Sequence, residues 1–190
     1  MEQDELLRHA ARCFDEHGIP YFVTGAVAAI AYGEPRLTND IDIVADLDED
    51  KIPGLKSCYP ADEFYFDEES ARRAVRTRSQ FNIIHPGSGL KIDIMITQGD
   101  EFDQSRFRRA RRLKPIEDTE VDFASPEDVI LKKLDFYRQG RSDKHLRDIV
   151  GILKISGDII DLMYIEVWAR KLGLEEIWAA VAKRAEKRAE

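Results

Sequence analysis

The sequence has few cysteines and histidines and no long apolar run. Its 190 residues include 2 cysteines and 4 histidines, too few for a disulfide framework, and Cys13 and Cys58 do not have the spacing of a metal site. We expect Cys13 to pack in the core, and Cys58 indicates nothing further. No apolar stretch approaches the about 20 residues of a membrane-spanning helix, and the acidic start, Met1 to Glu5, is unlike a signal peptide. We therefore expect a cytoplasmic protein with no membrane partner.

Positive charge is also in the minority. The chain has 29 lysines and arginines against 37 acidic residues, a formal net charge of −8, which argues against non-specific nucleic-acid binding over the whole surface. A local exception is the run 106–114, where five arginines and a lysine occur in nine positions. This run could steer an RNA or a triphosphate. Because Glu117, Asp118 and Glu120 follow it, we favour a solvated face balanced by acids.

The chain length and pattern predict one α/β core with a modest helical extension. Apolar residues make up 43% of the sequence, enough for a globular core, and no internal repeat or low-complexity stretch is present. Residues 1–124 alternate between strand and helix patterns. Ser125 is then a helix N-cap, followed by Pro126, and helical periodicity continues to the end. We therefore predict an α/β core over 1–124 and a helical region over 125–190 that packs on it.

The most informative stretch runs from Thr24 to Val44. Gly25 follows an apolar run and opens a short Ala-rich helix that Gly33 ends. A strand follows in which Asp40 and Asp42 point to one face, because side chains alternate along a strand. Two carboxylates on one strand face need a cation, and a hard divalent ion with oxygen ligands is the natural candidate.

A third carboxylate lies on a later strand. Residues 81–85 and 90–96 predict two strands joined by a hairpin turn at 86–89, and Asp93 falls on the half-polar face of the second strand. Its alternative role is that of an ordinary solvated strand residue. His85, beside the turn, is more typical of a structural or solvated histidine than of a catalytic one.

This motif resembles the nucleotidyltransferases of the DNA polymerase β superfamily, in particular small bacterial members near the toxin subunit of abortive-infection (AbiEii-like) systems. The matching positions are Gly25, Ala28, Gly33, Arg36, Thr38, Asp40 and Asp42. A second family motif, S-P-E-D followed by K-L, matches Ser125 to Leu134, so the resemblance covers roughly residues 19–150. One position departs: Ala26 stands where the family usually has Gly or Ser, which removes a hydroxyl and restricts positive φ.

The resemblance implies an α+β, polymerase β-like fold, with a mixed sheet flanked by helices and a C-terminal helical segment. It also implies that Mg²⁺ or Mn²⁺ is held by Asp40, Asp42 and Asp93, which act as the catalytic carboxylates. The nucleotide would be bound by Thr24, Gly25, Ala26, Arg36, Thr38 and Lys133. For Arg36 the alternative is a salt bridge to an acidic neighbour, and for Lys133 it is a solvated helix lysine.

Two functions remain open at the level of sequence. In the first, the protein moves NMP from an NTP to a hydroxyl-bearing acceptor, which is an RNA end, a protein side chain or a small molecule such as an antibiotic. It would then be a component of a toxin–antitoxin pair, with an antitoxin partner. In the second, favoured by Ala26, it is an inactive member of the fold that binds a nucleotide or a partner.

Overall fold

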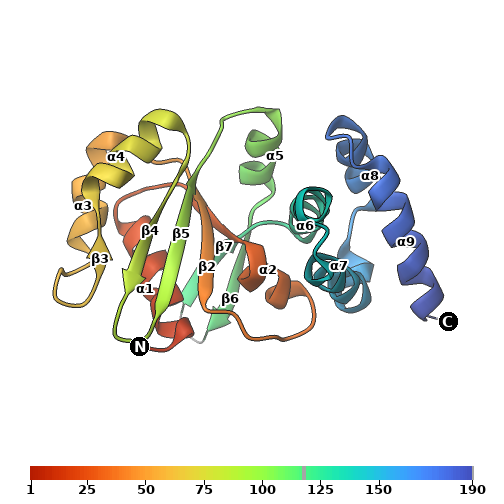
Figure 1. Ribbon diagram of the computed structural model, residues 1–190, viewed down its shortest axis with the longest axis horizontal. Helices are drawn as coiled ribbons and strands as arrows, with labels where there is room; N and C mark the ends of the chain where they lie inside the picture. The colour runs from red at the N-terminus through yellow and green to blue at the C-terminus, as the bar shows by residue number, and fades with distance from the viewer. Residues whose placement is uncertain (117–118, 190) are drawn as a thin grey trace. The chain divides into compact units, whose positions relative to one another are not determined.

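A mixed sheet of seven strands dominates the N-terminal part of this computed structural model, which describes residues 1–116 and 119–189 (Figure 1). The chain divides into two compact units. The first comprises Met1–Val27 and Thr38–Ala124, and the second Ala28–Leu37 and Ser125–Glu190. The domain ranges 1–124 and 125–190 stay a prediction. The compact units differ from them by grouping Ala28–Leu37 with the C-terminal helices.

All the strands belong to the first unit. They are β1 (Tyr21–Thr24), β2 (Asp40–Ala45), β3 (Tyr65–Phe66), β4 (Gln80–His85), β5 (Leu90–Ile96), β6 (Arg111–Ile116) and β7 (Thr119–Phe123). Their order across the sheet is β3-β4-β5-β2-β1-β7-β6. The pairs β2/β5 and β1/β7 are parallel and the other neighbours are antiparallel. The predicted α+β class with a mixed sheet is therefore confirmed.

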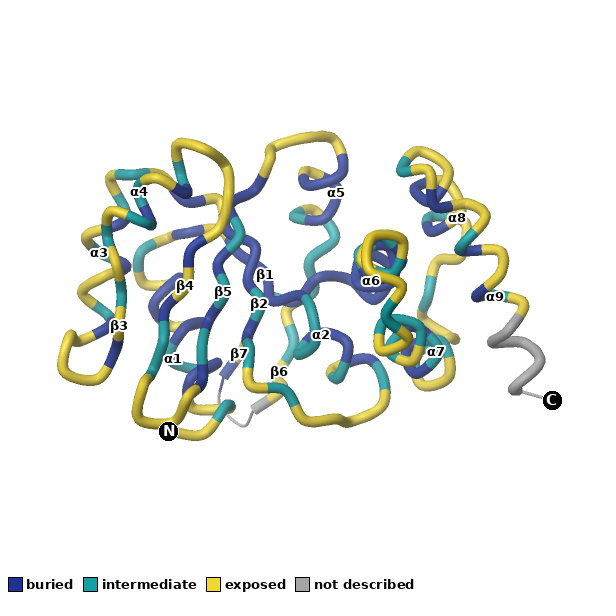
Figure 2. The backbone as a smooth tube through the Cα atoms, in the orientation of Figure 1, coloured by how far each residue is buried: buried dark blue, intermediate teal, exposed yellow. Residues whose placement is uncertain are grey.

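Helices cover both faces of this sheet. In the first unit they are α1 (Gln3–Glu16), α3 (Ile52–Ser57), α4 (Glu68–Thr77) and α5 (Glu101–Arg109), and α2 (Gly25–Tyr32) begins in this unit. Tyr21 and Phe22 are consecutive on β1 and so point to opposite faces. The Tyr21 ring lies 4.9 Å from Phe14 of α1, and the Phe22 ring lies 4.9 Å from Phe107 of α5. All four residues of β1 are buried (Figure 2).

Two segments of the first unit form secondary structure that their composition does not indicate. The region 51–66, which has the helix breakers Pro53 and Gly54, nevertheless contains α3 and β3. Pro53 is tolerated because it lies in the first turn of α3, where a missing N–H breaks no helical hydrogen bond. The arginine-rich run does not continue as one helix, since α5 ends at Arg109 and β6 begins at Arg111.

The arginine run is only in part the solvated face that its composition indicates. Arg112 follows the prediction, because it forms ion pairs with Asp15, Glu120 and Asp122 at 2.7, 3.3 and 3.1 Å. Arg106 does not. It is buried, and its guanidinium carbon lies 4.7 Å from the centre of the Phe22 ring. The predicted acids Glu117 and Asp118 lie outside the described residues.

The two cysteines have a role that their sequence spacing did not indicate. Cys13 of α1 is buried, as expected, but it forms a disulfide with Cys58, the residue after α3. The two Cα atoms are 6.1 Å apart and the residues are separated by 45 positions. The pairing was missed because it depends on the packing of α1 beside α3, and α3 itself was not predicted.

The second unit is helical. Its elements are α6 (Pro126–Gly140), α7 (Asp143–Ser156), the 3₁₀ turn η2 (Gly157–Ile159), α8 (Leu162–Lys171) and α9 (Glu175–Ala189). The predicted N-cap of α6 is present, since Ser125 Oγ accepts a hydrogen bond from the Asp128 N–H at 3.2 Å. Within the described part of the chain, no helix combines the length and apolar character needed to cross a membrane.

Gly33, which follows the end of α2, is needed for close packing. A Cβ at this position would lie 2.9 Å from the main-chain oxygen of Ala29 and 3.0 Å from the main-chain nitrogen of Ile152 on α7. Its φ is not among the positive values that mark left-handed helix caps in the described residues. The glycine therefore allows α2 and α7 of the second unit to approach closely, rather than forming the C-terminal cap that the sequence indicated.

Candidate functional site

Strand register brings the three predicted carboxylates onto neighbouring positions of two strands. Asp42 of β2 is opposite Asp93 of the parallel strand β5, and Asp40 is opposite Lys91. Paired positions of adjacent strands point to the same face, so all four side chains lie on one side of the sheet. Thr24 of β1, opposite Asp42, shares this face. Phe22 lies two positions before Thr24 on β1, so it points to the same face, where it contacts α5.

The turn after β1 is built around Asp42. Gly25 has a φ of +64°, which L-residues rarely adopt, and a Cβ on it would lie 2.5 Å from Cγ of Asp42. Glycine is therefore required twice, for its backbone conformation and for the approach of the carboxylate. Ala26 is not among the described residues with positive φ. The restriction that a Cβ places on positive φ therefore has no consequence at Ala26. The remaining difference from the family pattern is the missing serine hydroxyl.

A lysine that was not predicted to be functional lies among the carboxylates. Lys91 Nζ is 2.7 Å from Oδ2 of Asp93 and 3.7 Å from Oδ1 of Asp40. The hydrogen bond to Asp93 holds the pKa of this ammonium above its ordinary value. The sequence contained a signal, because residues i and i+2 of a strand share a face, so Lys91 had to lie beside Asp93.

The cluster is open to water and suits a hard cation. The side chains of Asp40, Asp93 and Lys91 are 47%, 20% and 37% exposed, so a hydrated ion can reach them. Carboxylate oxygens are the donors that Mg²⁺ and Mn²⁺ prefer, and the Lys91 ammonium already contacts two of the three carboxylates. Their oxygens are not gathered as tightly as a closed site would require. In the described part of the chain, three potential metal ligands whose donor atoms do lie within 4.8 Å of one another are Cys13, His17 and Cys58.

Two of the predicted nucleotide-binding residues meet in the second unit. Arg36 Nε and Lys133 Nζ lie 3.0 and 2.5 Å from the two carboxylate oxygens of Asp148, whose side chain is only 8% exposed. Burial alone would raise the pKa of Asp148, but the hydrogen bonds from Arg36 and Lys133 outweigh it and lower the pKa. The salt-bridge alternative for Arg36 is therefore observed. Lys133 is buried, so the solvated alternative for that residue is wrong.

Asp148 and Thr38 belong to different compact units. Asp148 was not identified from the sequence, because it lies 112 positions from Arg36 and nothing in its local pattern distinguishes it. Thr38, the last predicted nucleotide contact, belongs to the first unit and directs its hydroxyl to the main-chain oxygen of Asp40 at 3.4 Å.

Comparison with known proteins places the chain in a family. No curated protein sequence matches it. Among solved structures, an antigenic nucleotidyltransferase-like protein from Paracoccidioides brasiliensis is 20% identical, with a TM-score of 0.54 over 81% of this chain and 78% of that one. The structure of ANT(2″)-Ia in complex with adenylyl-2″-tobramycin is 15% identical, with a TM-score of 0.58 over 96% of this chain and 98% of the other.

These similarities establish the nucleotidyltransferase fold, and a family model adds the closer assignment. The model that describes the nucleotidyl transferase AbiEii toxin of type IV toxin–antitoxin systems matches residues 6–190. Because the match spans nearly the whole chain, the protein belongs to the AbiEii family of nucleotidyltransferases.

Proposed function

We propose that this nucleotidyltransferase uses Mg²⁺ or Mn²⁺, held by Asp40, Asp42 and Asp93, to transfer NMP from an NTP to an acceptor hydroxyl. The observation that carries the proposal is the strand register that sets Asp42 opposite Asp93, with Asp40 two positions away on the same face. The Gly25 turn supports it, because the missing Cβ lets the backbone lie against the Asp42 carboxylate.

The triphosphate is bound by the turn between β1 and α2. Main-chain N–H groups of the first turn of a helix bear partial positive charge and have no partner within the helix, so they favour an anion. Thr24, Gly25 and Ala26 provide this turn, and Thr38 adds a hydroxyl. Arg36 and Lys133 are retained as triphosphate contacts on the family resemblance, and a phosphate would compete with Asp148 for them.

The reaction is an in-line displacement at the α-phosphorus. A bond forms from the acceptor oxygen to this phosphorus as the bond to the β-phosphate oxygen breaks, and pyrophosphate leaves. Asp93 accepts the proton of the acceptor hydroxyl, and the Lys91 ammonium that hydrogen-bonds this carboxylate competes with the metal for it. A bound divalent ion supplies charge neutralisation of the triphosphate and polarises the reacting groups.

The acceptor class follows from the same chemistry. Any hydroxyl that reaches Asp93 can be an acceptor, so RNA ends, hydroxyl-bearing protein side chains and small polyhydroxylated molecules are the candidates. The ANT(2″)-Ia structure, with its adenylylated aminoglycoside, illustrates a small-molecule acceptor on this fold. Within the type IV toxin–antitoxin family, we propose that the activity is the toxic function and that an antitoxin opposes it.

The test is transfer of label. The protein is incubated with each α-³²P-labelled NTP, Mg²⁺ or Mn²⁺, and separately with total RNA, total protein or an aminoglycoside. We expect one acceptor class to be labelled by the wild type and by Asp46→Asn, and not by Asp93→Asn. Asp46 follows β2 directly and is exposed, so it controls for loss of one surface charge. Label on no acceptor under any condition would instead support the inactive nucleotide- or partner-binding alternative.

A further inference from the structure

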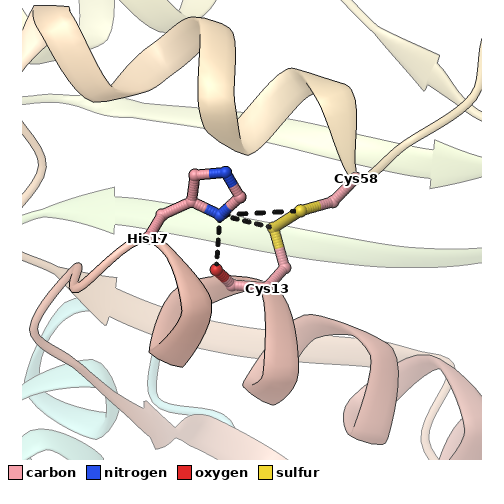
Figure 3. A group of neighbouring side chains, drawn as sticks. All are labelled: Cys13, His17 and Cys58. Carbon is pink, nitrogen blue, oxygen red and sulfur yellow. Dashed lines mark hydrogen bonds between the residues drawn. A yellow bond between two sulfur atoms is a disulfide. The ribbon is translucent and has the colours of Figure 1, made fainter.

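A second cluster of potential ligands lies in the first unit and has different chemistry from the aspartates. Cys13 and His17 are one turn apart at the end of α1, and Cys58 follows α3 (Figure 3). The Nδ1 atom of His17 is 4.0 Å from the Cys13 sulfur and 3.8 Å from the Cys58 sulfur. The three ligand atoms all lie within 4.8 Å of one another.

We propose that Cys13, His17 and Cys58 bind a thiophilic divalent cation such as Zn²⁺ when the two cysteines are reduced, and that the disulfide is the metal-free state of the same site. Thiolate and imidazole ligands select Zn²⁺ over Mg²⁺, whereas carboxylates favour Mg²⁺. This site is therefore distinct in chemistry from the aspartate cluster, and the proposal does not depend on the transferase activity.

The backbone is already arranged for both states. With Zn–S and Zn–N bonds of about 2.3 and 2.1 Å, tetrahedral geometry places a sulfur about 3.6 Å from the nitrogen and about 3.8 Å from the other sulfur. The two observed S···N distances, 4.0 and 3.8 Å, are close to that value. Only the sulfurs must move apart, and reduction of the disulfide allows this by side-chain rotation. The fourth position is left for water.

The His17 ring packs against α3 at Gly54, where the absence of a side chain leaves room for it. A Cβ on Gly54 would lie 2.8 Å from Nε2 of His17 and closer still to Cδ2, so any larger residue displaces the imidazole. In the disulfide state, Nδ1–H of His17 donates to the main-chain oxygen of Cys13 at 3.0 Å. The ring is half-buried, so solvent can exchange this proton and leave the Nε2–H tautomer, in which Nδ1 has a lone pair for the metal.

Reduction of the disulfide supplies the two thiols that the metal requires. A phosphine reductant gives two electrons to the disulfide and becomes the phosphine oxide with oxygen from water, while the two sulfurs take up two protons. The main-chain oxygens of Leu55 and Gly54, each 3.8 Å from a cysteine sulfur, can accept these thiol hydrogens. Binding of Zn²⁺ releases two thiol protons and leaves a neutral Zn(Cys)₂(His) centre, which suits a site where Cys13 is 2% exposed.

The experiment titrates Co²⁺ as a spectroscopic probe, and then Zn²⁺ in competition, into protein treated with a phosphine reductant. We expect one equivalent of Co²⁺ to give a thiolate-to-cobalt charge-transfer band in the reduced protein, and none in the disulfide form. The band reports sulfur ligation, so metal on the aspartate cluster does not interfere. His17→Ala and Gly54→Ala keep both thiols. Each should raise the Kd for Co²⁺ at least about tenfold, because even the loss of an outer-shell partner of a metal ligand has an effect of that size.

The matched controls are Cys58→Ser, which removes one of the two thiolates and should weaken both the band and the binding, and His85→Ala, a histidine that hydrogen-bonds Ser88 elsewhere in the unit and should leave the band unchanged. Circular dichroism of each variant separates loss of the site from loss of the fold. The proposal is overturned if the reduced, folded wild type gives no charge-transfer band, or if His17→Ala binds Co²⁺ as tightly as the wild type. A disulfide that resists the reductant in the folded protein would overturn it as well.

Discussion

The aspartate cluster can be tested without knowledge of the acceptor, by the response of the melting temperature to metal. Asp42→Asn removes the central one of the three carboxylates, which lies opposite Asp93 and against the Gly25 turn. If the folded state alone binds Mg²⁺ or Mn²⁺, metal raises the free energy of unfolding of the wild type by RT ln(1 + [L]/Kd). This is about 2.7 kcal/mol at a hundredfold excess of metal over Kd. For a protein of this size, this corresponds to about 5–10 °C in Tm.

The substitution should remove most of that gain. A hundredfold rise in Kd at the same metal concentration leaves about 0.4 kcal/mol, or roughly 1 °C. Differential scanning fluorimetry of the wild type and Asp42→Asn, each with and without metal, measures this. The compared quantity is the metal-induced shift of each protein rather than its absolute Tm. An NTP should raise the Tm further only in the presence of metal.

Asp46→Asn is the matched control for this prediction. Asp46 follows the end of β2, is exposed, and donates its main-chain N–H to the Pro20 oxygen, so the same chemical change there should keep the full metal response. Two results would refute the reasoning: a wild-type Tm that does not respond to millimolar metal, or an Asp42→Asn protein that responds as strongly as the wild type.

Three further predictions follow from individual contacts. Gly25→Ala should lose more than the about 1–2 kcal/mol of stability that a left-handed backbone costs an alanine, because the added Cβ also overlaps the Asp42 carboxylate, and it should lose the metal-induced Tm shift. Gly89→Ala, with a φ of +72° and nothing within 4 Å of the added Cβ, should lose only stability, and equal metal shifts in the two variants would contradict this. Lys91→Met should tighten metal binding up to about fivefold in calorimetric titration, because a partly exposed ion pair contributes up to about 1 kcal/mol. Weaker binding would mean that Lys91 positions the site rather than competing for it. Asp148→Asn should lower the free energy of unfolding by about 3 kcal/mol at pH 7, since it leaves Lys133 buried without this partner. Because the folded-state pKa of Asp148 is lowered, its contribution is present above the unfolded pKa of about 3.9 and is lost as the pH falls through the folded-state value. The gap between wild type and variant in urea denaturation should therefore close in acid, and a constant gap would contradict the assignment.

The features that the sequence determined are those governed by local chemistry. Alternation along a strand placed Asp40 and Asp42 on one face whatever the rest of the fold does. The Ser125 cap followed by proline defined the start of α6, and a hydrogen bond between neighbours confirms it. Gly25 was recognisable as a turn residue because it stands between an apolar run and an Ala-rich helix. These signals depend on residues a few positions apart, so no knowledge of distant packing is required to interpret them.

Tertiary structure decided everything that depends on distant segments meeting. The parallel register of β2 and β5 made Asp93 the partner of Asp42, and it placed Lys91 next to Asp40. The buried carboxylate of Asp148 received Arg36 from 112 positions away. Cys13 and Cys58 became neighbours only because α3 packs beside α1. Such pairings are set by the burial of apolar faces and the register of long-range hydrogen bonds, which local sequence patterns do not encode.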